Sequence, residues 1–136
     1  MPSFEHTAHS GAPPEEVWKL LYDPARFPDW WEGMASVEDT RPGGGGRKSY
    51  TIYPDGYPDF PIPQLVESTR DGRRVVISCQ VSDLIFSWRL EPEEGGTRID
   101  VSVEIPEKEA FRLEQQRELI RRSLVRLAEV AAATPL

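Results

Sequence analysis

Apolar and polar residues alternate along residues 73–105, and this alternation predicts three β-strands. One phase is apolar throughout and comprises Val75, Ile77, Cys79, Val81, Leu84, Phe86, Trp88, Leu90, Ile99, Val101, Val103 and Ile105. The opposite phase is mostly polar. Because strands covered on both faces read as continuous apolar runs, the pattern favours an antiparallel sheet with one buried face. Asp71-Gly72 and Gly95-Gly96 are dipeptides typical of the tight hairpins that connect such strands.

The other segments add helices and further strands. Pro14, followed by two glutamates, predicts the first turn of a short amphipathic helix, and Asp23-Pro24 predicts the N-cap and first residue of a second one. Residues 107–133 contain no Gly or Pro and are rich in helix formers, so they predict one long helix. The four prolines within residues 54–63 predict an irregular loop. Strands are expected at residues 3–10, 35–39, 47–53 and 62–69.

The apolar face of the sheet needs a cover, and the C-terminal helix is the element long enough to supply it. The stripe of this helix that would meet the sheet consists of Glu109, Leu113, Gln116, Ile120, Leu124, Leu127 and Ala131. Its second half is apolar, whereas Gln116 interrupts the first half. Because a buried glutamine without a partner costs about 1 to 3 kcal/mol, we expect polar groups or open space opposite Gln116.

Aromatic residues are available to surround that half of the helix. Apolar walls with a few polar groups are typical of small-molecule pockets. The same rings could instead fill a solid core, and composition alone favours that alternative. The candidate ligand-binding residues are Trp30, Trp31, Tyr50, Tyr53, Ile77, Cys79, Phe86, Trp88, Leu113, Gln116 and Ile120.

The order of elements, together with the run APPEEVWKLLYDPARFPDWWEGMASV at residues 12–37, resembles the START-like, or helix-grip, superfamily of lipid-binding and polyketide cyclase/dehydrase proteins. The resemblance covers essentially the whole chain and implies a single domain, residues 1–136, of class α+β. It implies a curved seven-stranded antiparallel sheet around the long C-terminal helix, with two short helices between strands 1 and 2. It also implies a ligand cavity between sheet and helix. The superfamily includes carriers, cyclases, stress proteins and chaperone regulators, so the fold does not specify an activity.

Three functions are consistent with these features. The first is binding of a small hydrophobic molecule, such as a lipid or polyketide, in the internal cavity. The second is a polyketide cyclase/dehydrase in which Gln116 and Tyr50 or Tyr53 would contact a bound polyketone. The third is a protein-interaction or chaperone-regulator module that uses the Pro-rich loop. Arg89 and Arg98 fall on the polar phase of the sheet, which argues against dedicated cyclase chemistry, although Arg26, Asp55, Asp59 or Arg112 could reach in from loops or helices.

Charge and composition limit the classes of partner and the kinds of site that we expect. The chain carries 16 basic and 23 acidic residues and a formal charge of -7, which argues against nucleic-acid binding. A single cysteine excludes an intramolecular disulfide, and His6 and His9, three apart on a strand, would point to opposite faces and could not share a metal. We therefore expect no metal and no cofactor, and the sequence shows no evident catalytic constellation, so whether the protein is an enzyme of the cyclase/dehydrase kind stays open. No leader or long apolar run is recognised, so we expect a cytoplasmic protein, a monomer or weak homodimer, without membrane insertion.

Overall fold

Seven strands form one antiparallel sheet in the order β1-β7-β6-β5-β4-β3-β2. The computed structural model describes residues 3–42, 47–54, 62–68, 73–79 and 83–133. The strands are β1 (Ser3–Ser10), β2 (Met34–Pro42), β3 (Arg47–Pro54), β4 (Ile62–Ser68), β5 (Arg74–Cys79), β6 (Ile85–Glu93) and β7 (Gly96–Glu104). The helical elements are α1 (Pro14–Tyr22), η1 (Pro24–Arg26), α2 (Phe27–Trp30), η2 (Glu107–Arg112) and α3 (Leu113–Ala133).

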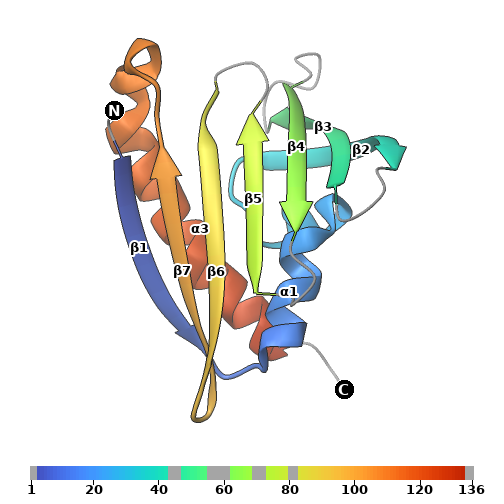
Figure 1. Ribbon diagram of the computed structural model, residues 1–136, viewed down its shortest axis with the longest axis vertical. Helices are drawn as coiled ribbons and strands as arrows, with labels where there is room; N and C mark the ends of the chain where they lie inside the picture. The colour runs from blue at the N-terminus through green and yellow to red at the C-terminus, as the bar shows by residue number, and fades with distance from the viewer. Residues whose placement is uncertain (1–2, 43–46, 55–61, 69–72, 80–82, 134–136) are drawn as a thin grey trace.

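The helix α3 covers one face of the sheet, behind β1, β7 and β6 in the view of Figure 1. The sheet curves around it, and β2 and β3 turn across the far side next to α1 and α2. Two helical segments, α1 and the consecutive η1 and α2, lie between β1 and β2. The predicted α+β architecture is therefore confirmed, including the seven-stranded antiparallel sheet and the long C-terminal helix.

The strand phases predicted for β5, β6 and β7 are also confirmed. The apolar phase is buried on the concave face, which the helices cover, whereas Arg89 and Arg98 are exposed on the outer face. Of the residues assigned to the apolar phase, Val81 lies outside the described residues, as does the predicted Asp71-Gly72 turn. The α3 stripe is apolar and buried from Ile120 onward, as predicted.

The hairpin between β6 and β7 differs by one residue from the prediction. Glu93 pairs with Gly96, so the two-residue loop is Glu94-Gly95, and Gly96 is already the first residue of β7. Gly95 has φ +86° and Gly96 φ +154°, values that residues with a side chain rarely adopt. A Cβ at Gly96 would overlap the carbonyl oxygen of Ser10. Glycine is therefore required here by both backbone conformation and the close approach of β1.

The C-terminal helix begins differently from the expected single α-helix. Residues Glu107–Arg112 form a 3-10 helix, and the α-helix starts only at Leu113. The N–H of Glu109 donates to the carbonyl oxygen of Pro106 at 2.8 Å, which is the tighter i to i+3 pattern. No side chain of the 3-10 segment is fully buried, so no core packing holds it in α-helical geometry.

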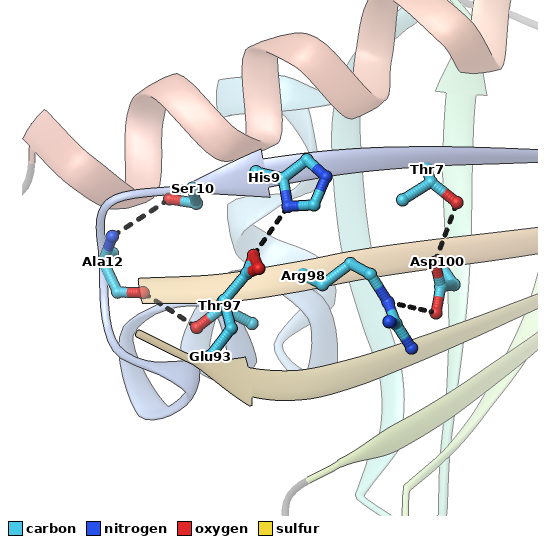
Figure 2. A network of polar contacts seen from close by, with 8 residues as sticks. All are labelled: Thr7, His9, Ser10, Ala12, Glu93, Thr97, Arg98 and Asp100. Carbon is cyan, nitrogen blue, oxygen red and sulfur yellow. Dashed lines mark hydrogen bonds and ion pairs between the residues drawn. The ribbon is translucent and has the colours of Figure 1, made fainter. Parts of the chain in front are cut away.

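A buried network joins the end of β1 to the last turns of α3. Ser10 Oγ donates to the carbonyl oxygen of Ala128 at 2.8 Å and accepts from the N–H of Ala12 at 3.2 Å. Thr97 Oγ1 donates to the carbonyl oxygen of Ala12 at 2.8 Å. Figure 2 shows the contacts of Ala12 with Ser10 and Thr97. This end of the molecule is thus closed by hydrogen bonds as well as by apolar packing.

Candidate functional site

Aromatic side chains from α2 and the residue after it, from β3 and from β6 meet on the concave face of the sheet. Neighbouring ring centroids are 5.0 to 5.7 Å apart, and none of the rings is more than 4% exposed. This aromatic cluster consists of Phe27, Trp30, Trp31, Tyr50, Phe86 and Trp88. The structure therefore brings together most of the predicted aromatic site residues, and they contact one another directly.

The short helix α2 carries two of these rings, Phe27 and Trp30, and hydrogen bonds in the preceding segment fix its position. Asp23 Oδ1 accepts from the N–H of Ala25 at 3.1 Å and caps η1, as predicted. Trp30 then donates its indole N–H to the carbonyl oxygen of Leu20 at 2.9 Å. Leu20 needs this donor because the residue four positions later is Pro24, which has no N–H. The contact ties the aromatic cluster to the end of α1.

Trp88 differs from Trp30 in its hydrogen bonding. Its indole Nε1 is buried and has no partner among the described residues. The ring meets those of Trp30 and Trp31 edge to face, with interplanar angles of 86° and 70°. An indole N–H normally finds an acceptor when buried, so this donor is unusual.

A row of three polar side chains crosses the concave face beside the aromatic cluster. Tyr50 on β3 pairs with Gln64 on β4, and Gln64 pairs with Cys79 on β5. The hydroxyl of Tyr50 donates to Gln64 Oε1 at 2.7 Å, and all three residues are buried. Burial, and next the proximity of Cys79, raise the pKa of Tyr50 well above its ordinary value, so the phenol stays neutral. Tyr50 and Gln64 thus form a neutral hydrogen-bonded pair in apolar surroundings.

Gln64 was not among the predicted site residues. The face on which Gln64 lies could be predicted, because Val66 two positions later is apolar and is buried. The partner of Gln64 on the neighbouring strand could not be predicted. The register between β3 and β4 decides that Gln64 faces Tyr50, and alternation within one strand does not specify register.

Tyr53 lies apart from the aromatic cluster. It lies three residues after Tyr50 on the same strand, so its side chain points to the outer face. There its hydroxyl donates to Glu38 Oε2 at 3.2 Å, and the negative charge of this carboxylate raises the pKa of Tyr53. Of the two tyrosines predicted as alternatives for one role, Tyr50 is the one on the concave face.

The helix and β5 contribute the remaining predicted residues. Ile120 and Ile77 are fully buried in the core. Leu113 packs against the core while staying half-buried, and Gln116 is also half-buried. The predicted open space opposite Gln116 stays a prediction. Arg26 and Arg112, considered as groups that reach inward, form ion pairs with Asp29 and Glu109, whereas Asp55 and Asp59 lie outside the described residues.

The two histidines point to opposite faces, as predicted. His6 Nε2 lies 3.1 Å from the carbonyl oxygen of Arg117 on α3. Because a carbonyl oxygen only accepts, this nitrogen carries the hydrogen. His9 Nδ1 lies 2.6 Å from Glu93 Oε1 on the outside (Figure 2). Within the described part of the chain, no group of three His, Cys, Asp or Glu side chains is placed to hold a metal ion. Among the same residues, no helix is both long and apolar enough to span a membrane.

The sheet, the covering helix and the apolar concave face define a protein of the START-like, helix-grip class. The sequence pattern of the family described as polyketide cyclase / dehydrase and lipid transport matches residues 1–132, so the chain belongs to this family. The resemblance noted from the sequence is thereby confirmed. No curated relative matches the sequence.

Solved structures with the same fold share little sequence with the chain. The Zhui aromatase/cyclase from Streptomyces sp. R1128 is 15% identical with a TM-score of 0.75, over 96% of this chain and 93% of that one. The protein XoxI from Bacillus cereus is 16% identical with a TM-score of 0.75, over 98% and 97%. Ara h 8.0201 is 17% identical with a TM-score of 0.66, over 98% and 99%. At these identities the likeness establishes the fold alone.

Proposed function

We propose that the protein binds a small, uncharged, largely apolar molecule between the sheet and α3, and that an acceptor oxygen of this molecule meets the amide of Gln64. The observation that carries the proposal is the buried 2.7 Å hydrogen bond from Tyr50 to Gln64 Oε1. Tyr50 occupies the amide oxygen, so the Gln64 amide presents its N–H groups elsewhere. A carbonyl or hydroxyl oxygen of a bound molecule would satisfy them.

The other buried polar side chains support this assignment by contrast. The buried polar residues among those described are Ser10, Gln64, Thr97 and Ser123, and none is charged. Ser10 and Thr97 donate to main-chain carbonyls, and Ser123 accepts from the N–H of Glu32 at 2.9 Å. These three hydroxyls hold the fold together. Gln64 instead pairs with another side chain, in surroundings that favour a neutral ligand over an ion.

A pair of matched probes tests the proposal. We expect 2-acetylnaphthalene, which has a carbonyl acceptor, to quench tryptophan fluorescence with an affinity about 10-fold higher than that of 2-ethylnaphthalene, which lacks one. Gln64→Leu should remove this preference, and Tyr53→Phe should keep it. Binding of neither probe, together with no organic molecule in solvent extracts of the purified protein, would overturn the proposal.

A second candidate is a polyketide cyclase/dehydrase, supported by the family and by the similarity to an aromatase/cyclase fold. The Gln64 amide could then donate a hydrogen bond to an enolate oxygen as charge develops on it, and the Tyr50 hydroxyl could add a second one by turning away from Gln64 Oε1. Tyr50→Phe would lower turnover of a polyketone substrate by roughly 10² to 10³. Equal turnover by Tyr50→Phe and the wild-type protein would exclude this role.

A further inference from the structure

Trp88 lies in the middle of the aromatic cluster and carries a donor that the fold does not use. Of the buried side-chain nitrogens and oxygens in the described part of the chain, its indole Nε1 is the one without a hydrogen-bond partner. Trp30 is equally buried and has the carbonyl oxygen of Leu20 as its acceptor. A buried N–H without an acceptor destabilises a protein, and such groups are rare in native structures.

The strands beside Trp88 do not supply the acceptor. Trp88 pairs with Val75 on β5 and with Val101 on β7, and both neighbours have apolar side chains. The carbonyl groups of these strands lie close to the plane of the sheet, whereas the side chain of Trp88 stands roughly perpendicular to it. The other buried polar side chains among the described residues have partners elsewhere, namely Ser10, Gln64, Thr97 and Ser123.

The ring contacts of Trp88 do not require its nitrogen. The ring meets those of Trp30 and Trp31 edge to face, with centroids 5.2 and 5.7 Å apart. Phe86, two residues earlier on the same strand, makes the same kind of contact with Trp31 at 5.0 Å. What tryptophan adds to such a contact is a single N–H donor. This donor is available to a bound molecule.

Strand register sets the separation between this donor and Gln64. Gln64 pairs with Cys79 on β5, and Val75, four residues earlier on β5, pairs with Trp88. Two strand spacings and four residues correspond to about 10 Å across the sheet and about 13 Å along it. Gln64 and Trp88 are both buried on the concave face. A ligand that contacts both donors is therefore elongated.

We propose that Trp88 is a specificity-determining residue, whose indole N–H binds a second acceptor oxygen at the far end of an elongated, largely apolar ligand. The inference rests on the proposed function, because Gln64 binds the first oxygen. Gln64 is 5% exposed and Trp88 0%, so Gln64 is the more accessible donor. The ligand reaches Trp88 by displacing the ring of Trp31, which contacts it and lies between α2 and β2. A short ligand with one oxygen stops at Gln64.

Two probes that differ in one carbonyl group test this inference. 2,6-Diacetylnaphthalene has an acceptor at each end, whereas 2-acetyl-6-ethylnaphthalene has nearly the same shape and one acceptor. Fluorescence titration of the full chain should show about 10-fold tighter binding of the diketone. Trp88→Phe keeps an aromatic ring and should abolish this difference. The control Trp18→Phe removes an indole from α1 and should preserve it.

Spectra of the ¹⁵N-labelled wild-type chain give a second measurement that needs no variant. The diketone should move the indole N–H proton signal of Trp88 downfield relative to the monoketone. Both probes carry the same ring system, so the difference between them reports the acceptor. The indole signals of Trp18 and Trp30 should be the same with either probe.

The outcomes separate this inference from the proposed function. Equal affinities for the two probes, while 2-acetylnaphthalene still binds more tightly than 2-ethylnaphthalene, would overturn the role of Trp88 and leave the proposed function intact. A preference for the diketone that Trp88→Phe retains, or a Trp88 indole signal that is the same with both probes, would also overturn it. Binding of neither probe would overturn both proposals.

Discussion

The phenol hydroxyl of Tyr50 donates a 2.7 Å hydrogen bond to Oε1 of Gln64, and both side chains are almost completely buried on the concave face of the sheet. Each side chain supplies the hydrogen-bond partner that the other would otherwise lack, because water does not reach this position. A buried polar pair of this kind contributes little net stability while it is intact, but it is costly to break from one side.

Removing one partner should therefore cost more than removing both. We expect Tyr50→Phe to lower the free energy of unfolding by about 1 to 3 kcal/mol, because it leaves Gln64 Oε1 without a donor. Adding Gln64→Leu should restore part of this loss. Urea unfolding of the single and double variants measures both effects, with Tyr53→Phe on the outer face as the control that changes stability little. A double variant less stable than either single variant would contradict the pairing.

The same tyrosine predicts a pH dependence of stability. Its pKa is raised above the ordinary value of 10.0 in the folded protein, chiefly by burial. Below that value both folded and unfolded chains keep the phenol proton, so the contribution to stability is fully present. Above it the unfolded chain loses the proton first, so the free energy of unfolding falls as pH rises. Urea unfolding between about pH 8 and 11 should show a steeper fall for the wild-type protein than for Tyr50→Phe. Parallel profiles would show that Tyr50 is not the group responsible.

The two central tryptophans form a matched pair of test sites. Trp30 and Trp88 are both 0% exposed, but among the described residues only Trp30 of these two has a hydrogen-bond acceptor, the carbonyl oxygen of Leu20. Trp30→Phe leaves that carbonyl unpaired, whereas Trp88→Phe removes a donor that has no partner in the described part of the chain. Trp30→Phe should thus destabilise the protein more, by about 1 to 3 kcal/mol relative to Trp88→Phe. Chemical unfolding of the two variants gives the difference, and the reverse order would show that Trp88 has an acceptor.

Gly96 should tolerate substitution poorly. Alanine there requires φ near +154° and overlaps the carbonyl of Ser10, so we expect Gly96→Ala to lower the free energy of unfolding by about 2 kcal/mol or more. Gly11→Ala is the control, because a Cβ at Gly11 meets no atom within 4 Å. Thermal unfolding of the two variants should separate them clearly. Similar melting temperatures would mean that β1 can move away from the hairpin.

Much of the fold could be predicted because alternation and helix propensity are local properties. The phases of β5, β6 and β7 follow from residues two apart, and the uninterrupted α3 up to Ala133 follows from the absence of Gly and Pro. The 3-10 start of the helix could not be predicted in this way. Most of residues Glu107–Arg112 are good helix formers, but none of their side chains is buried, so tertiary packing does not hold the segment in α-helical geometry.

The candidate site was predictable in its apolar part and less so in its polar part. Trp30, Trp31, Phe86 and Trp88 were identified from composition and phase, and the structure brings them into contact. Tyr50 and Tyr53 were equivalent in the sequence, because both phases of β3 carry an aromatic residue. Gln64 was missed because its role depends on which residue of the neighbouring strand stands opposite it, and this is a non-local property.

The hydrogen bond from Ser10 to the carbonyl oxygen of Ala128 attaches the C-terminal part of α3 to β1 more firmly than its N-terminal part. The helix is held by this hydrogen bond near its C-terminal end and follows a half-exposed 3-10 helix at its other end. It should therefore separate from the sheet more easily at Leu113 than at Ala131. Hydrogen–deuterium exchange should therefore be fastest in the first turns of the helix and slowest around Ala128. A ligand whose entry requires α3 to move away from the sheet would enter from the Leu113 side, and the helix would pivot about the hydrogen bond between Ser10 and Ala128.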